Sequence, residues 1–305
     1  MHISSLSRAA GRRATAAAAY RAGERIRDER SGELHNHSRR RDVLHAEIFL
    51  PQSYASAAMP WARNRERLWN AAEHAEKRHQ ARVAREFQVA LPAELAPPER
   101  LALARAFAAE IAERYRVAVD LAVHAPRPDG DPRNFHAHLL ATTREVTPAG
   151  LGAKAGLDMA PAERRRRELP YHRAEFTNVR ERWAALTNGA LRAANLDVRV
   201  DHRSLAAQGI AREPVPVIPI GQLKLERRGV RSEYAEQLRA AYRARVATRT
   251  ASAAVAAPRD LEEVRREARE AWLRLRAGAQ PATPAAESAR LAEAAAERAD
   301  DELTR

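Results

Sequence analysis

The sequence contains no cysteine, few aromatic residues and no long apolar run. Without cysteine the chain forms no disulfide, no thiolate zinc site and no cysteine nucleophile. A run of about 18 consecutive apolar residues is absent, which excludes an ordinary membrane-spanning helix. The first twenty residues are rich in alanine, but Arg8, Arg12 and Arg13 interrupt them and leave no apolar signal-peptide core. We therefore expect a soluble, cytoplasmic protein.

Lysine is also scarce, and this affects how the net charge of +13 is interpreted. Of the 53 basic residues, 3 are lysine and 50 are arginine, a bias that a GC-rich coding sequence produces on its own. The position of the charge is more informative. Residues 231–305 contain 14 Arg and 13 acidic residues, so +12 of the net charge lies in residues 1–230. Such an excess is expected of a segment that meets a polyanion such as nucleic acid.

The composition changes near Gly229. Beyond it the chain consists mainly of Ala, Glu, Arg and Leu, and the pattern predicts helices around 233–247 and 260–277. No apolar stripe in this part is wide enough for a core of its own. We therefore predict a folded domain over residues 1–230 and a charged, helical extension over residues 231–305.

Residues 1–230 mix predicted helices and strands. Hydrophobic periodicity and proline positions predict helices over residues 8–28, 60–82, 97–115 and 172–195. The same signals predict strands over residues 43–50, 84–91, 116–124 and 134–143. The loop before the last strand contains three prolines and a glycine, which is typical of a hairpin. This order indicates an α+β fold with an antiparallel sheet.

Three histidines lie at the ends of the two hairpin strands. His136 and His138 are two residues apart and therefore point to the same face of a strand. In a hairpin, His124 ends the first strand beside them, and the three imidazoles can converge on a Zn, Mn, Ni, Co or Fe ion. Asp120 lies on the same face as His124 and could orient an imidazole. The alternative is a solvent-exposed histidine pair without a metal.

Other catalytic signatures are missing, and one helix is unusual. No phosphate-binding glycine loop, serine-hydrolase motif or zincin motif is present, so ATP-driven chemistry has no support. Tyr20 is the only aromatic residue in an alanine-rich helix and is followed by Arg21 and Gly23. From spacing alone, Tyr20 is an aromatic anchor on a helix that packs closely against a sheet.

Several segments spread over about residues 1–229 carry a resemblance to a known family. They are Ser7-Arg8 through Ala19-Tyr20-Arg21-Ala22-Gly23-Glu24, Val43-Leu44-His45-Ala46-Glu47 through Leu50-Pro51, Ala84-Arg85-Glu86 with Val89-Ala90-Leu91-Pro92, His124 with Asn134-Phe135-His136-Ala137-His138, Arg182-Trp183-Ala184 with Asn188, and Val200-Asp201-His202-Arg203-Ser204-Leu205-Ala206-Ala207-Gln208-Gly209-Ile210. On these segments the chain resembles the MobA/MobL relaxases, the MobQ-type plasmid mobilisation nucleases of the HUH superfamily. Members usually have a few more residues before the first match, so we expect either that the first strand is short or that the start codon is misplaced.

The resemblance implies a fold and an activity. The implied fold is the HUH relaxase fold, with about five antiparallel strands and packed helices. A tyrosine matching Tyr20 attacks the scissile phosphate at the nic site of a transfer origin, leaving a 5′-phosphotyrosyl link and a free 3′-hydroxyl. Histidines matching His124, His136 and His138 hold a divalent ion, commonly Mg or Mn. The implied partners are single-stranded or supercoiled origin DNA, relaxosome accessory proteins and a type IV secretion coupling protein.

Two carboxylates and five arginines complete the predicted site. Asp42 and Glu86 match family positions where a carboxylate is common and are candidate general bases, with Glu47 a weaker third; a salt bridge is the alternative for each. DNA contacts are expected from Arg12, Arg13, Arg21, Arg127 and Arg133. The arginine run at residues 164–167 is a further candidate, and its alternative is the solvated start of a helix.

Two other functions remain open. Rolling-circle initiators and transposases share the HUH fold but usually place the tyrosine after the histidine pair. Tyr20 precedes His136 by more than a hundred residues, which favours a relaxase. A noncatalytic DNA-binding accessory protein of the same fold is the alternative from another class, and the presence of Tyr20 and all three histidines argues against it.

Overall fold

The computed structural model describes residues 1–52, 59–128, 130–256 and 261–278. The chain divides into two compact units, Met1–Arg203 and Ser204–Arg305. The predicted boundary at residue 230 falls inside the second unit, between α7 (Ile220–Arg227) and α8 (Glu233–Ala256), and that domain division stays a prediction. None of the helices in these ranges is both long and apolar enough to cross a membrane.

The first unit is built on a five-stranded antiparallel sheet with the strand order β1-β5-β7-β6-β4. Its strands are β1 (His2–Ser7), β4 (Val43–Phe49), β5 (Arg82–Ala90), β6 (Val119–His124) and β7 (His136–Thr142). Two small sheets pair β2 (Arg25–Arg27) with β3 (Leu34–Asn36), and β8 (Arg144–Thr147) with β9 (Gly150–Lys154). The predicted α+β fold with a central antiparallel sheet is confirmed. Strand β1 has six residues, all paired with β5, which has nine, and the expectation that it is short compared with family members stays a prediction.

The helices of the first unit flank this sheet. They are α1 (Ala14–Ala22), α2 (Pro60–Arg63), α3 (Arg65–Ala75), α4 (Pro97–Tyr115), α5 (Pro161–Arg166) and α6 (His172–Ala193), with 3₁₀ turns at Arg8–Ala10 and Gly156–Asp158. Helix α4 has the predicted bounds, because proline opens it and Arg116 ends it in the left-handed conformation, at φ 56°. In the second unit, α7 and α8 are followed by α9 (Leu261–Gly278), which supports the predicted helical extension.

Two predicted helices are too long. The helix expected over residues 8–28 is α1 alone, because Gly11 and Gly23 adopt the left-handed conformation, at φ 67° and 68°, on either side of it. The helix expected over residues 60–82 is divided into α2 and α3 by Asn64, whose side chain accepts a hydrogen bond from the Arg67 amide at 2.9 Å and caps α3. Residues 76–81 form a loop and a turn, not helix.

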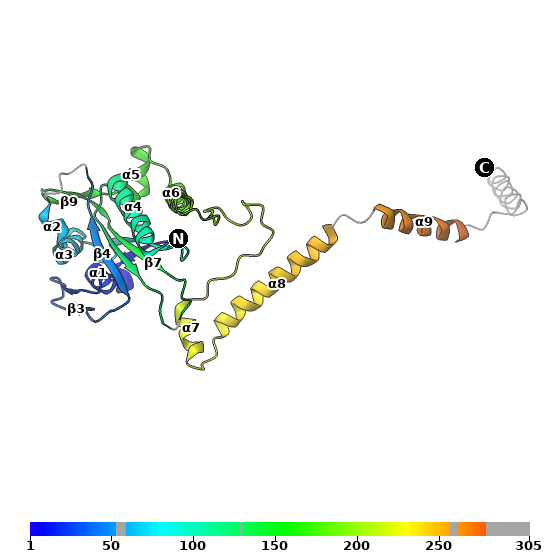
Figure 1. Ribbon diagram of the computed structural model, residues 1–305, viewed down its shortest axis with the longest axis horizontal. Helices are drawn as coiled ribbons and strands as arrows, with labels where there is room; N and C mark the ends of the chain where they lie inside the picture. The colour runs from blue at the N-terminus through cyan, green and yellow to red at the C-terminus, as the bar shows by residue number, and fades with distance from the viewer. Residues whose placement is uncertain (53–58, 129, 257–260, 279–305) are drawn as a thin grey trace, which may run out of the picture. The chain divides into compact units, whose positions relative to one another are not determined.

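The two faces of the sheet are covered differently (Figure 1). On one face Phe87 and Leu139 pack with Phe107 of α4 and Trp183 of α6 in a large apolar core. On the other face a second core of mostly small residues lies under α1 and α3. Side chains alternate between faces along a strand, and the cross-strand pairs His124↔His136 and Ala122↔His138 place all three histidines on the α1 side.

A buried ion pair joins α3 to β6 on this face. Arg65 donates to both oxygens of Asp120, at 2.9 and 3.0 Å, and Trp69 Nε1 donates to the same carboxylate at 2.9 Å. The carboxylate side chain is 4% exposed and the guanidinium side chain 9%. The hypothesis that Asp120 orients an imidazole is therefore wrong. Its carboxylate binds a partner 55 residues away, which sequence spacing does not reveal.

Removal of Asp120 is expected to destabilise the fold strongly. In an Asp120→Ala variant the Arg65 guanidinium stays buried but loses its buried carboxylate partner. Its other partner, Glu24, compensates little, because the Glu24 side chain lies at the surface and is 46% exposed. Breaking a buried ion pair from one side costs about 3–5 kcal/mol of unfolding free energy, which denaturant titration measures. The exposed Asp131–Arg133 pair provides a matched control, and Asp131→Ala should leave stability unchanged. Equal losses in the two variants would contradict this role for Asp120.

Candidate active site

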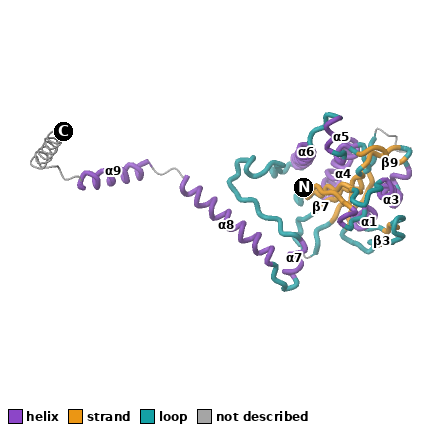
Figure 2. Tube along the Cα trace, turned by 180° about the vertical axis from the view of Figure 1, so that it is seen from behind, coloured by secondary structure: helices purple, strands orange, loops and turns teal. Residues whose placement is uncertain are grey.

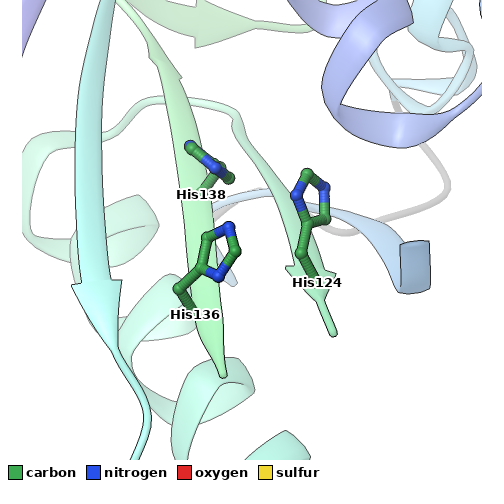
Figure 3. Close-up of side chains that lie close together, drawn as sticks. All are labelled: His124, His136 and His138. Carbon is green, nitrogen blue, oxygen red and sulfur yellow. The ribbon is translucent and has the colours of Figure 1, made fainter. Parts of the chain in front are cut away.

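The hairpin of β6 and β7 brings three imidazoles together (Figure 3). One ring nitrogen from each of His124, His136 and His138 lies within 4.8 Å of the others. The ring centroids are 4.9 to 5.3 Å apart. Figure 3 shows His136 and His138 projecting from one strand toward His124 on its neighbour. The predicted convergence of these residues follows from strand periodicity and the register of the pairing.

Each imidazole has one ring nitrogen bound to an oxygen acceptor. His124 Nε2 lies 2.8 Å from the Arg21 carbonyl, His136 Nδ1 lies 3.0 Å from the Asn134 carbonyl, and His138 Nδ1 lies 2.7 Å from Glu86 Oε1. These oxygens act as acceptors, so each contact favours a proton on the facing nitrogen. In that tautomer the other nitrogen of the ring has a free lone pair with which a metal ion could be bound.

Burial keeps the site in its ligating form. Desolvation lowers the pKa of His124 to about 4 and also lowers the pKa of His136. At neutral pH these two rings are therefore uncharged, as metal ligation requires. Three imidazole nitrogens form a suitable donor set for a divalent transition ion and leave coordination positions open.

Glu86 is fixed between the histidines and the arginine that follows Tyr20. Besides His138, its Oε1 accepts a hydrogen bond from Arg21 Nε at 2.6 Å. Burial acts to raise the pKa of Glu86, but these two partners outweigh it and hold the pKa at about 2. A carboxylate with so low a pKa is a weak proton acceptor. The geometry favours Glu86 as the residue that orients His138, and its assignment as a general base stays a prediction.

Tyr20 lies near the end of α1, with its side chain 43% exposed. The Arg40 guanidinium lies over the Tyr20 ring, 3.9 Å from its centroid, and Arg40 Nη1 donates to the Tyr20 carbonyl at 2.6 Å. His37 packs edge-on against the same ring at 5.3 Å. These contacts fix the ring on two sides and leave part of it open to solvent.

Arg21 connects the tyrosine helix to the histidines. Its carbonyl binds His124 and its side chain binds Glu86, so both groups of the residue after Tyr20 contact the site. The close approach depends on small residues, since Ala18, Ala19 and Ala22 are buried on the inner face of α1. Gly23 ends the helix at φ 68°, where a Cβ would lie 3.2 Å from a Val43 methyl group. The small residues of this motif therefore set the position of Tyr20.

Asp42 precedes β4 at the same edge of the site. Its Oδ1 accepts from Arg40 Nε at 2.9 Å, and its carbonyl accepts from the Ala125 amide at 2.8 Å, one residue beyond His124. The Arg40 hydrogen bonds hold the pKa of Asp42 below its usual value. Like Glu86, Asp42 is paired with an arginine, and its role as a general base stays a prediction.

The predicted DNA-binding arginines have different environments. Arg12 and Arg13 line a shallow groove of about 460 Å³ together with Tyr20 and Arg21. Arg13 also bonds to Glu33 at 3.2 Å, and the side chain of Arg21 is 17% exposed because it binds Glu86. Arg127 is exposed and lowers the pKa of His136 by its charge, although burial is the main cause. Arg133 is exposed and paired with Asp131 at 2.8 Å.

The weaker candidates take part in salt bridges or internal contacts. Glu47 binds His45 at 3.1 Å and Arg105 at 3.0 Å, as the salt-bridge alternative expects. In the arginine run, Arg164 is buried and donates to the Pro170 carbonyl at 2.8 Å, whereas Arg167 pairs with Glu163 at 2.7 Å. Arg40 and His37 are the residues that sequence reasoning missed. Arg40 lies within three consecutive arginines, and nothing in that pattern distinguishes it from its neighbours.

Comparison with known proteins agrees with the resemblance noted in the sequence. A family profile described as MobA/MobL family matches residues 12–228. The mobilization protein MobL of Acidithiobacillus ferridurans is 37% identical over 254 residues, which cover 74% of this chain and 64% of that protein. The conjugal transfer protein TraA of Rhizobium radiobacter is 30% identical over 251 residues, covering 75% of this chain and 22% of that protein. The chain therefore spans less than two thirds of the length of these relatives.

A solved structure described as "Molecular Basis of Vancomycin Resistance Transfer in Staphylococcus aureus" has a similar fold. It matches with a TM-score of 0.54 and 29% sequence identity, covering 67% of this chain and 97% of that chain. The match covers nearly the whole of that chain.

Proposed function

The chain belongs to the MobA/MobL family, and on this premise we propose that it is a relaxase that nicks one strand of transfer-origin DNA by tyrosine transesterification. The observation that carries the proposal is the cluster of three histidines, one of which contacts the carbonyl of Arg21, the residue after Tyr20. The proposed role is conjugative mobilisation of a plasmid.

In the proposed reaction Tyr20 Oη attacks the scissile phosphorus. The bond from phosphorus to the 3′-oxygen breaks as the bond to Tyr20 forms, which leaves a 5′-phosphotyrosyl link. A phenol is mostly protonated at neutral pH, so its proton leaves during attack and the departing 3′-oxygen gains a proton. One phosphodiester is exchanged for another, so the reverse step rejoins the strand without ATP.

The histidines are proposed to hold a divalent ion, Mg or Mn in line with the family resemblance. When bound, such an ion would neutralise phosphate charge and stabilise the transition state. The chain's own residues fix the donors. The carbonyls of Arg21 and Asn134 and the carboxylate of Glu86 orient the three rings, and Glu86 also holds Arg21, and hence the end of α1, against β5. We propose that Glu86 and Asp42 are positioning residues.

The proposed function is tested by mixing the protein with single-stranded DNA from a cognate transfer origin and a divalent ion. A covalent protein–DNA adduct that survives denaturing electrophoresis is the expected result. Proteolysis and mass spectrometry should then place the phosphate on the peptide that contains Tyr20. DNA binding without any adduct would favour the noncatalytic accessory protein. Proteins that assemble on the origin and the secretion coupling protein remain predicted partners.

Arg40 is expected to accelerate the reaction by fixing the Tyr20 ring. Arg40→Gln removes the cation that lies 3.9 Å from the ring centroid and the bond to the Tyr20 carbonyl. We expect the single-turnover rate of adduct formation at saturating DNA to fall by about 10- to 100-fold, because a small displacement of a nucleophile is costly. Arg39→Gln and Arg41→Gln remove the same charge from exposed neighbours and serve as controls. Arg40→Lys should recover part of the rate. An equal loss in the controls would mean that only local charge matters.

A further inference from the structure

Three grooves on the first unit follow one another from Tyr20: the first two share lining residues, and the third is lined by the sequence neighbours of a residue that lines the second. The groove beside Tyr20 is lined by Gly11, Arg12 and Arg13, and these residues also line a second groove of about 310 Å³ that contains Arg30 and His79. A third groove, of about 750 Å³, begins on either side of His79, at Arg78 and Gln80. The path thus runs from the tyrosine over the start of α1 to the loop after α3.

The surface of this path is positively charged. Several arginines and lysines line it, and we call six of them the basic track: Arg12, Arg13, Arg30, Lys77, Arg78 and Arg82. Two of the three lysines of the chain, Lys77 and Lys154, line the third groove. The concentration of these residues in one place is not explained by the arginine-rich composition.

Four acidic residues line the path, and two of them contact track residues: Asp28 lies 4.0 Å from Arg13, and Asp158 lies 3.8 Å from Arg82. The four are Asp28, Glu73, Glu76 and Asp158, each 7% exposed or less. Each is bound internally: Glu73 by Arg8 at 2.8 Å and Asp28 by Thr15 at 2.5 Å. Glu76 is bound by Arg144 at 2.7 Å, and Asp158 by Arg85 at 2.5 Å. The exposed charges facing the grooves are therefore the cations.

Four of the track residues have charged groups without a partner in the described part of the chain. Within the part of the chain that the structure describes, the guanidinium groups of Arg12, Arg30 and Arg78 and the ammonium group of Lys77 make no hydrogen bond or ion pair. All four side chains belong to exposed residues. Unpaired like charges repel one another, and a polyanion laid along the track would relieve that repulsion. In the arginine run at residues 164–167, by contrast, Arg166 and Arg167 form ion pairs with Glu163.

We propose that the basic track binds the phosphates of the single strand that flanks the cleaved position. The proposal rests on the proposed function, because it is Tyr20 at one end that identifies the polyanion as DNA. Helix α1 rises about 1.5 Å per residue, so its start lies about 9 Å from Tyr20. The strand leaving the tyrosine therefore meets Arg12 and Arg13 first, then Arg30, and then Lys77 and Arg78. Contacts of this kind add affinity without reading sequence.

The test compares a Lys77→Gln/Arg78→Gln variant with an Arg67→Gln/Arg192→Gln control. The control also loses two exposed cations, from α3 and α6 and outside the track. Fluorescence anisotropy with labelled single-stranded DNA gives the affinity at several salt concentrations. For the track variant we expect the affinity for DNA to be about tenfold weaker at about 0.1 M salt. We also expect the slope of log affinity against log salt concentration to be smaller in magnitude by about 1.4, which is about 0.7 for each of the two phosphates that the variant no longer neutralises. The control should resemble the wild type.

Oligonucleotide length separates the track from the catalytic site. On a short oligonucleotide that covers little beyond the nic position, the track variant should form the adduct at the wild-type rate. On a substrate extended along one side of the nic position, the track variant should need a higher DNA concentration than the wild type to reach the same rate of adduct formation. If the track variant and the control have equal affinities and equal salt slopes, the proposal that the basic track binds DNA is wrong, even if adducts form. If the wild type forms no adduct, the proposed function fails, whereas the anisotropy result still decides the track.

Discussion

A Tyr20→Phe variant is expected to form no covalent adduct with origin DNA, with a loss of at least about 10³-fold in the rate of cleavage. Phenylalanine keeps the ring that contacts Arg40 and His37 but removes the oxygen that would form the bond to phosphorus. A nucleophile that forms a covalent intermediate is not replaced by its neighbours, and losses of this size or larger follow its removal. Since the side chain is 43% exposed, the fold should be unaffected.

The measurement is adduct formation on denaturing gels, accompanied by DNA affinity from anisotropy. Affinity should change little, because the charges around the grooves remain. Tyr171→Phe is a matched control, since this tyrosine is 76% exposed and lies outside the site, just before α6. Cleavage by Tyr20→Phe at the wild-type rate would show that another group attacks the phosphate. Loss of DNA binding together with cleavage would instead indicate a structural role for the hydroxyl.

Replacement of His136 by alanine is expected to reduce divalent-ion affinity by more than about 100-fold. The substitution removes one of the three ligand nitrogens themselves. Because loss of a residue that only orients a ligand already lowers metal affinity by about 10- to 100-fold, loss of a ligand should lower it by more. Isothermal titration with Mn²⁺ and Zn²⁺ measures this directly, and Zn²⁺ should bind more tightly than Mn²⁺ on nitrogen donors. In the wild type, ion at about 100 times its Kd should also stabilise the fold by about 2.7 kcal/mol, seen as a rise in Tm.

The control for this experiment is His74→Ala. His74 lies at the surface on α3 and pairs with Glu29, so its loss should leave ion affinity and the rise in Tm unchanged. Since desolvation keeps the pKa of His124 near 4, proton competition at this ring should be weak at neutral pH. If His136→Ala bound Mn²⁺ as tightly as the wild type, the three histidines would not be the metal site.

The parts of the site that are local in sequence could be predicted from it. His136 and His138 share a face because strand periodicity is fixed, and proline-rich punctuation indicated the turn that pairs them with His124. The bounds of α4 followed from its proline and its periodicity. The bounds of α1 could not be predicted in this way, because residues with high helix propensity lie on both sides of Gly11 and Gly23. The left-handed backbone at these two glycines limits the helix at its two ends.

The parts that depend on distant partners could not be predicted. Asp120 lies on the predicted face, but Arg65 and Trp69 from another element bind its carboxylate. Glu86 was singled out as a proton acceptor, whereas the structure ties it to His138 and Arg21 across separations of 52 and 65 residues. In a chain with 50 arginines, composition does not distinguish the Arg40 that contacts Tyr20 from those that face solvent.

The strand order of the sheet determines when the site can form during synthesis. The strands, orange in Figure 2, gather in the first unit. Among the five strands of the central sheet, β6 and β7 are the one pair of sequence neighbours that are also partners in the sheet. Each of the other pairings, β1 with β5, β4 with β6 and β5 with β7, joins strands that are separated by another strand in the sequence. Tyr20 leaves the ribosome more than a hundred residues before His136. Long-range pairing of this kind forms late in folding. A nascent chain therefore carries Tyr20 without the histidines, and the candidate site is complete only when β7 has paired between β5 and β6.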